Sequence, residues 1–195
     1  MTAQASDIVL FRKQQYSLAG VDGTGLFDPA ALGLKPVGWS TACWRGYVCT
    51  YSVKEDRLLL TTLQISFAKT EPPPTLFGQN PDSKARLHGF CYSSLAHPIP
   101  FTGGLLLGRD FVRELYVHMG FHPAWKFREV HELIFENGLL REAGDRSQAA
   151  EEFRKRIKSE DLRPSDTGKI GDWIEQTFSL NYQRPGRLSR PPPRP

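Results

Sequence analysis

Two histidines four residues apart, His118 and His122 in the stretch YVHMGFH, are the first residues of this sequence that indicate metal chemistry. Zinc enzymes use this spacing on an α-helix, because residues i and i+4 lie close together on one helical face. Here apolar and polar residues alternate from position 115 to 122, which predicts a β-strand with one apolar face. Gly120 and Pro123 also disfavour a helix. On a strand the two imidazoles would be ~13 Å apart, so we expect no shared zinc ion.

The other residues able to bind a metal show no ligand spacing. The sequence contains no Cys-x-x-Cys and no His-Glu-x-x-His motif, which are the spacings of common zinc sites. We therefore predict no metal and no cofactor. A metal site assembled from distant parts of the chain would have to draw on Cys91, His88, His97, His118, His122 and His131.

Three further motifs resemble functional ones and are predicted to be structural. Residues 103–110, GGLLLGRD, have the glycine spacing of a phosphate-binding loop, but Arg109 and Asp110 replace its lysine and hydroxyl residue, so a strand and turn are expected. The tripeptide Asp-Thr-Gly at 166–168 occurs in aspartic proteases, yet its position predicts a helix cap. Glu132 fits the solvated face of a sheet. No Gly-x-Ser-x-Gly elbow is present, and we predict no catalytic residue.

The most unusual local cluster is WSTACWRGYVCTY, residues 39–51, in which two tryptophans and two tyrosines surround Arg45. Large aromatic residues with an arginine are the composition of binding hot spots, and an arginine can stack on an indole. The second interpretation is a core entrance, in which Arg45 covers an indole and pairs with a carboxylate. Because large aromatics also dominate cores, the sequence alone favours this second interpretation.

Length, charge and cysteines restrict the class of protein. The 195 residues, 39% of them hydrophobic, suit one domain with a single core. The net charge of +4 comes from the four arginines after residue 183, which leave 21 basic and 21 acidic residues in the rest of the chain. We therefore expect no nucleic-acid binding except through this tail. We expect neither a signal peptide nor a membrane span, and three cysteines, an odd number, suit reduced thiols in a cytoplasm.

Alternation and turn signals predict an antiparallel β body. A strand is expected at 7–18, followed by a glycine-rich turn at 19–25. Two β-hairpins are expected, one over residues 46–67 with a charged tip and one over 126–144 with Asn137-Gly138 as its turn. A proline-rich surface loop is expected from 68 to 87. The remaining expected elements are a short helical turn at 29–32, strands at HGFCYSSL (88–95) and FTGGLLLG (101–108), and the histidine strand at 115–122.

The pattern changes after Gly144 and predicts helices. Residues 145–161 place Asp145 and Gln148 at capping-box spacing, ahead of an apolar face with acids early and bases late. A second, weaker helix is expected at 168–178. The predicted fold class is α+β: a mainly antiparallel β body (1–144), a C-terminal segment of one or two helices packed on it (145–182) and a disordered Arg/Pro-rich tail (183–195).

Two groups of motifs resemble those of a family of small uncharacterised bacterial β-rich proteins. The first group is STACWRGYVCTYSV with DRLLL, and the second is FTGGLLL with YVHMGF and ENGLL. In that family a Trp-Arg-Gly-Tyr hairpin precedes a Tyr-Val-His-Met-Gly strand, and the resemblance covers residues 39–140. It implies a β-rich bacterial domain without a known activity. The family motif residues Trp44, Arg45, Tyr116 and His118 are the binding site that the resemblance suggests.

These expectations give a leading function and a rival. The leading hypothesis is a non-enzymatic, cytoplasmic protein-interaction domain with an unknown protein partner. By analogy with other small bacterial β domains, this domain could be one member of a defence pair or a toxin-immunity pair. The rival is a hydrolase or metal-dependent enzyme with a site on the face that carries His118.

Overall fold

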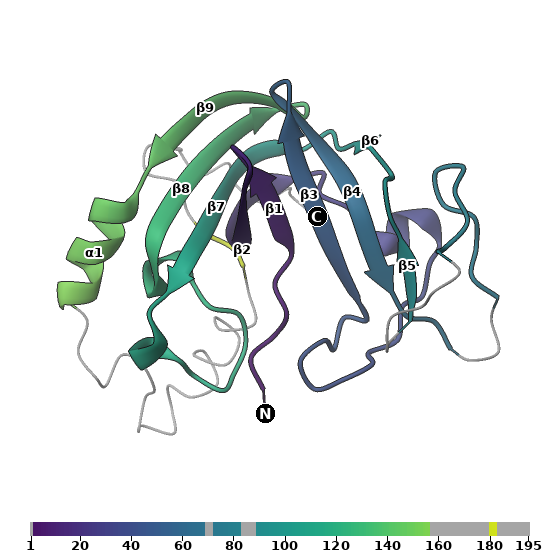
Figure 1. The fold of residues 1–195 in the computed structure, drawn as a ribbon, viewed down its shortest axis with the longest axis horizontal. Helices are drawn as coiled ribbons and strands as arrows, with labels where there is room; N and C mark the ends of the chain where they lie inside the picture. The colour runs from purple at the N-terminus through teal and green to yellow at the C-terminus, as the bar shows by residue number, and fades with distance from the viewer. Residues whose placement is uncertain (1, 69–71, 83–88, 157–179, 183–195) are drawn as a thin grey trace, which may run out of the picture.

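The computed structural model describes residues 2–68, 72–82, 89–156 and 180–182. The helix expected at 168–178, the Asp-Thr-Gly tripeptide and the tail from 183 lie outside these residues. Within the described part of the chain, a seven-stranded mixed β-barrel is followed by one helix (Figure 1). The predicted α+β class, a mainly antiparallel β body with a C-terminal helix, is therefore confirmed.

Three tight turns set the hairpins of the barrel. Both residues of each turn, Arg12–Lys13, Glu55–Asp56 and Asn137–Gly138, have positive φ, which is the backbone that a two-residue hairpin needs to match the twist of its strands. The hairpins expected at 46–67 and 126–144 are thus confirmed. The single strand expected at 7–18 is instead a hairpin, and its second strand runs on through residues 19–24, which we had predicted to be a turn.

The barrel closes in the order β1-β2-β7-β8-β9-β4-β3 and back to β1. Neighbouring strands are antiparallel except β1 and β3, which are parallel. Closure between β9 and β4 rests on one residue pair, and β6 and β5 occupy the rest of that edge of β4. The strands are β1 (Ile8–Phe11), β2 (Gln14–Thr24), β3 (Tyr47–Lys54), β4 (Arg57–Ile65), β5 (Phe90–Tyr92), β6 (His97–Pro98), β7 (Thr102–Phe111), β8 (Phe127–Glu136) and β9 (Leu139–Asp145).

Aromatic and aliphatic side chains fill the barrel. The largest fully buried residues include Tyr51, Tyr92, Phe101 and Phe135, so the interior is a packed core of the kind found in small barrels. The three cysteines, all among the described residues, form no disulfide. Among the described residues, no helix is both long enough and apolar enough to cross a membrane.

The helix α1 (Ser147–Arg156) packs on β8 (Figure 1). Asp145 accepts a hydrogen bond from the Ser147 N–H at 2.8 Å, as a residue at a helix start does. The capping box itself is absent, because the Gln148 amide donates to Glu152 instead of turning back. Ala150 is buried against a small second core with Phe127 and Val130.

Three short 3-10 helices complete the described structure: η1 (Pro29–Leu32), as expected at 29–32, η2 (Arg113–Leu115) and η3 (Ala124–Lys126). The strand expected at 115–122 is wrong. These residues form a loop between η2 and η3, in which Gly120 has a positive φ and contacts Ala3 through an isolated bridge. The flanking strands β7 and β8 pair with each other and with β2 and β9, which leaves this segment no free edge beside them.

Candidate functional site

The N-terminal residues 2–6 run between two loops and hold them together. The Gln4 N–H donates to the Gly120 carbonyl at 2.7 Å, on the loop that follows β7. The Ala5 N–H donates to the Ala42 carbonyl at 2.7 Å, on the loop that leads into β3. The aromatic cluster at 39–51 and the YVHMGFH stretch are therefore neighbours in space, although some 70 residues separate them in sequence.

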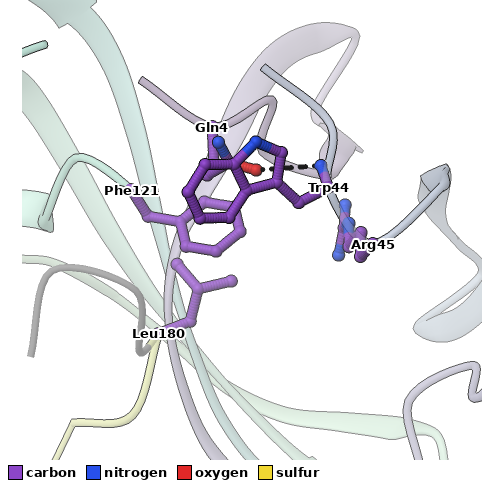
Figure 2. A pocket seen from close by; sticks show the side chains of 5 residues that line it. All are labelled: Gln4, Trp44, Arg45, Phe121 and Leu180. Atoms are coloured by element: carbon purple, nitrogen blue, oxygen red, sulfur yellow. Dashed lines mark hydrogen bonds between the residues drawn. The ribbon is translucent and has the colours of Figure 1, made fainter. Parts of the chain in front are cut away.

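A hollow of about 320 Å³ lies between these loops (Figure 2). Trp44 and Phe121 present aromatic rings to it from the two loops, and Leu180 adds an aliphatic wall. The Trp44 side chain is unusual because 52% of it is exposed, whereas large aromatic side chains are buried on average. The described residues that line the hollow are Gln4, Trp44, Arg45, Phe121 and Leu180.

Arg45 is held at the hollow by a buried carboxylate. Its two terminal nitrogens donate to the two oxygens of Asp7, with Nη1 at 3.1 Å from Oδ2, and the Cys49 N–H donates to the same carboxylate at 2.7 Å. Burial alone would lower the pKa of Arg45, but the charge of Asp7 and the hydrogen bonds to it raise the pKa above its ordinary value. The guanidinium also lies over the ring of Tyr47, 4.6 Å from its centroid. Two opposite charges thus cancel beneath an apolar surface.

Gln4 fixes the backbone that carries the indole. Its side-chain oxygen accepts a hydrogen bond from the Trp44 N–H at 3.2 Å, drawn as a dashed line in Figure 2. Its side-chain nitrogen donates to the Thr41 carbonyl at 2.8 Å. Because Gln4 is itself buried, these bonds hold the loop from below and leave the indole facing outward.

The structure separates the four predicted site residues into two pairs. Trp44 and Arg45 both line the hollow, whereas Tyr116 and His118 are not among its described lining residues. Tyr116 contacts His118 and His122, with ring centroids 4.7 Å and 5.1 Å apart. These two distances together are shorter than the ~13 Å expected for a strand, so that expectation is wrong. Among the described residues, no group of three metal-ligating side chains occurs.

Lys126 is buried and His122 is partly buried beside this aromatic group, and no acidic residue among those that the structure describes is paired with either of them. Both ring nitrogens of His122 are buried and make no hydrogen bond. Burial, and then the charge of Lys126, lower the pKa of His122 to about 4. Burial also lowers the pKa of Lys126 to about 8, and its ammonium lies 5.3 Å from the Trp125 ring centroid. This part of the loop is therefore more stable when its imidazole is neutral.

A second group of ionisable side chains, Tyr16, Arg109, Glu129 and His131, lies where β7 ends and β8 begins. We call it the polar cluster. The Glu129 carboxylate accepts hydrogen bonds from Tyr16 at 2.6 Å, from Arg109 Nε at 2.7 Å and from His131 at 3.2 Å. Partial burial would raise the pKa of Glu129, but these bonds lower it. Burial and the bond to Glu129 raise the pKa of Tyr16 to about 12. Each member already has a partner, so the cluster supports the barrel end.

Sequence reasoning identified Trp44 and Arg45 and missed the residues around them. Asp7, Gln4, Phe121 and Leu180 come from three distant parts of the chain, and no local pattern connects them. The interpretation of Arg45 as a residue that pairs with a carboxylate is confirmed, but its guanidinium covers a tyrosine ring instead of an indole. The polar cluster had one signal, since Glu129 and His131 alternate with the same period as the core residues Leu133 and Phe135.

Comparison with known proteins adds no further constraint. No protein-family model matches the chain. No curated protein and no solved structure matches it either. We therefore infer the function of the protein from the geometry of the hollow and of the residues that hold it.

Proposed function

We propose that the protein is a non-enzymatic interaction domain, and that the hollow beside Trp44 holds one neutral side chain of a partner protein. The observation that supports this proposal is the exposure of Trp44, which is 52% exposed and lines the hollow with Phe121 and Leu180. Buried Gln4 and Asp7 hold the loop that carries it. Tryptophan is one of the residues enriched at binding hot spots, which cluster in well-packed pockets.

The size of the hollow favours a single side chain as its occupant. Its volume of about 320 Å³ is at the lower end of the ~300–1,000 Å³ that small-molecule and cofactor sites span. One aromatic or large aliphatic residue from a partner would bring apolar area against Trp44, Phe121 and Leu180 together. Such anchors contribute most of the energy of a protein interface.

The charges at the hollow favour a neutral anchor over an acidic one. Arg45 is the charged residue of the described lining, and its positive charge is already balanced by the buried Asp7 carboxylate. An acidic side chain in the hollow would compete with Asp7 and lose its own hydration. An apolar side chain has no such hydration to lose on entering the hollow.

The residues that hold the hollow also reduce the cost of binding. Gln4 bonds to the backbone at Trp44, and Asp7 bonds to the side chain of Arg45. A surface that is ordered before the partner arrives loses less conformational entropy on association.

Selection of short peptides tests the proposal directly. A displayed library of random heptapeptides would be selected on the full chain alone, and the enriched peptides would then be tested on the Trp44→Ala variant. We expect enriched peptides to share one aromatic or large aliphatic residue. Their Kd should change less than about threefold between ~50 mM and ~500 mM salt, because no net charge is paired on binding. Enrichment of acidic peptides with steep salt dependence would contradict the neutral anchor, and peptides that bind Trp44→Ala equally well would contradict the site.

A further inference from the structure

Residues 180–182 pair with an edge of β2 that β1 does not cover. β1 covers only the first residues of β2, so the other strands that the structure describes leave this edge of β2 uncovered from about Ala19 onward. Val21 uses both of its backbone groups there: its N–H donates to the Leu180 carbonyl at 2.6 Å, and its carbonyl accepts from the Tyr182 N–H at 3.2 Å. The bridge between Val21 and Asn181 is parallel. This is the hydrogen bonding by which an extended peptide adds a strand to a sheet.

The sheet surface beside this edge is shaped for an aromatic ring. The ring of Tyr182 lies over Gly20 and Gly104, two positions that have no side chain. A Cβ atom at Gly104 would lie 2.1 Å from the Tyr182 hydroxyl oxygen, and one at Gly20 would lie 3.1 Å from the ring. A Cβ atom does not approach another atom to 2.1 Å, so any larger residue at Gly104 would displace the tyrosine, whereas the contact at Gly20 is tight.

Beyond the two glycines, the carboxylate of Glu132 binds the hydroxyl group of Tyr182. The Tyr182 hydroxyl donates to Glu132 Oε1 at 3.0 Å. Arg146 donates to the other oxygen of the same carboxylate, from Nε at 2.9 Å and from Nη2 at 2.8 Å. Glu132 is 4% exposed, which corrects our expectation of a solvated face. A buried carboxylate of this kind is stabilised by each donor it receives, so the site favours tyrosine over phenylalanine.

The same three residues connect this surface to the hollow. Leu180, whose carbonyl pairs with Val21, contributes the aliphatic wall opposite Trp44 (Figure 2). Displacement of residues 180–182 would therefore remove one wall of the hollow while the barrel keeps its own hydrogen bonds.

We propose that the edge of β2, the floor at Gly20 and Gly104 and the Glu132 carboxylate form a binding site for an extended peptide that carries a tyrosine. The chain's own residues 180–182 are its ligand, and their docking completes the hollow. The link to partner binding rests on the proposed function, whereas the peptide site itself does not.

Amide hydrogen exchange at Val21 tests the peptide site in the full chain. In the wild type this amide should be protected by its bond to Leu180. In Tyr182→Ala we expect protection to fall at least about tenfold, because the ring and hydroxyl contacts that hold the strand are lost. Gly104→Ala should have the same effect, and Gly144→Ala is its matched control, since a Cβ there meets nothing closer than 3.5 Å. Unchanged exchange of β8 amides would show that the barrel remains folded.

Rescue in trans separates a binding site from a merely structural contact. The peptide acetyl-Ser-Leu-Asn-Tyr-Gln-amide, added to Tyr182→Ala, should restore the protection of Val21, and the matching phenylalanine peptide should restore it less. Equal protection of Val21 in the wild type and in Tyr182→Ala would overturn the proposal, as would failure of the tyrosine peptide to restore it.

The link to the hollow has its own readout. A heptapeptide selected on the hollow should bind Tyr182→Ala at least about fivefold more weakly than the wild type, because the Leu180 wall is displaced. If Val21 loses protection while this affinity is unchanged, the link is wrong and the peptide site stands. If selection yields no peptide for the hollow, the proposed function fails, and the exchange experiment still decides the peptide site.

Discussion

Two arginine–carboxylate pairs, Arg45 with Asp7 and Arg109 with Glu129, have similar chemistry and different surroundings. In both, the arginine contacts its carboxylate through two nitrogens and lies near a tyrosine ring, at 4.6 Å from Tyr47 and 5.6 Å from Tyr16. The Asp7 side chain is 6% exposed, whereas that of Glu129 is 29% exposed. The Arg45 side chain is 24% exposed and that of Arg109 is 41% exposed, so the first pair is more buried at both of its members.

This difference in burial determines what each region can do. At the hollow, the charges cancel below the surface, and Trp44 and Phe121 line the apolar surface above them. In the polar cluster, Arg109 faces solvent while Glu129 also binds Tyr16 and His131. A network of this kind orients its own members and ties β2, β7 and β8 together. This contrast supports our proposal of binding at the first region, whereas the hydrogen bonds of the second region support the barrel.

The largest expected effect is the loss of the buried partner. Asp7→Asn should lower the free energy of unfolding by ~3–5 kcal/mol, because it leaves the Arg45 charge buried without compensation. Urea denaturation followed by far-ultraviolet circular dichroism measures this change. The double variant Asp7→Asn with Arg45→Leu should recover part of the loss, since no unpaired charge remains. A loss no larger than that of the matching change at Glu129 would contradict the difference in burial.

The matching change in the polar cluster should cost less. Glu129→Gln should lower the free energy of unfolding by ~1–2 kcal/mol, because the charge-assisted hydrogen bonds become neutral ones in a partly hydrated place. The pKa of Tyr16, about 12 in the wild type, should also fall, although burial will keep it above that of an exposed tyrosine. Ultraviolet titration of the tyrosines measures this shift. A Tyr16 pKa that does not move would contradict the bond to Glu129.

Acid should act on the loop beside the hollow through His122. The pKa of His122 is lowered from 6.5 to about 4, so below pH 6.5 the unfolded chain binds a proton that the folded chain excludes. This contribution to stability is present above pH 6.5 and is lost as pH falls towards 4. Because the ring is only partly buried, we expect the loss to be ~1 kcal/mol at pH 5.

The His122→Phe variant should lack this acid dependence between pH 6.5 and 4. His118→Phe is the matched control, since His118 is exposed and its substitution should leave the dependence unchanged. Unfolding in urea at a series of pH values gives both slopes. Equal slopes for the two variants would contradict the burial of the His122 ring.

The smallest expected effect on stability comes from the residue most important for the proposed function. Trp44→Ala should lower the free energy of unfolding by ~1 kcal/mol, because about half of the residue is already exposed. Urea denaturation measures it, with Tyr51→Ala as the contrasting variant, since Tyr51 is fully buried. A loss above ~2 kcal/mol for Trp44→Ala would make the indole a core residue and would support the core-entrance interpretation of the cluster, which the sequence alone favoured.

The elements with local signals could be predicted from the sequence. Asn137-Gly138 between apolar runs gave the β8–β9 hairpin, and alternation around the charged tip gave β3 and β4. The turn at Arg12–Lys13 was missed because neither residue type favours a positive φ. The loop at 115–122 alternates like a strand, but alternation does not reveal whether a partner edge is available.

For the candidate site, the sequence could predict only that aromatic residues gather around an arginine. Trp44 and Arg45 were identifiable as an aromatic group with an arginine, whereas Asp7 lies 38 residues away in sequence from Arg45. Glu132 shows the same limit, because its position on a strand predicts exposure and only the arrival of Arg146 and Tyr182 buries it. Burial of a strand residue by residues that are distant in sequence does not change the apolar–polar periodicity of the strand, so the sequence does not reveal it.

The most direct test of the central claim compares one peptide on two variants. The heptapeptide selected on the hollow would be titrated against the wild type, Trp44→Ala and Tyr16→Phe by isothermal calorimetry. We predict that Kd rises at least about thirtyfold in Trp44→Ala, as for a hot-spot residue, and changes less than about twofold in Tyr16→Phe. A Kd that rises in Tyr16→Phe and stays constant in Trp44→Ala would place binding at the polar cluster and contradict the account.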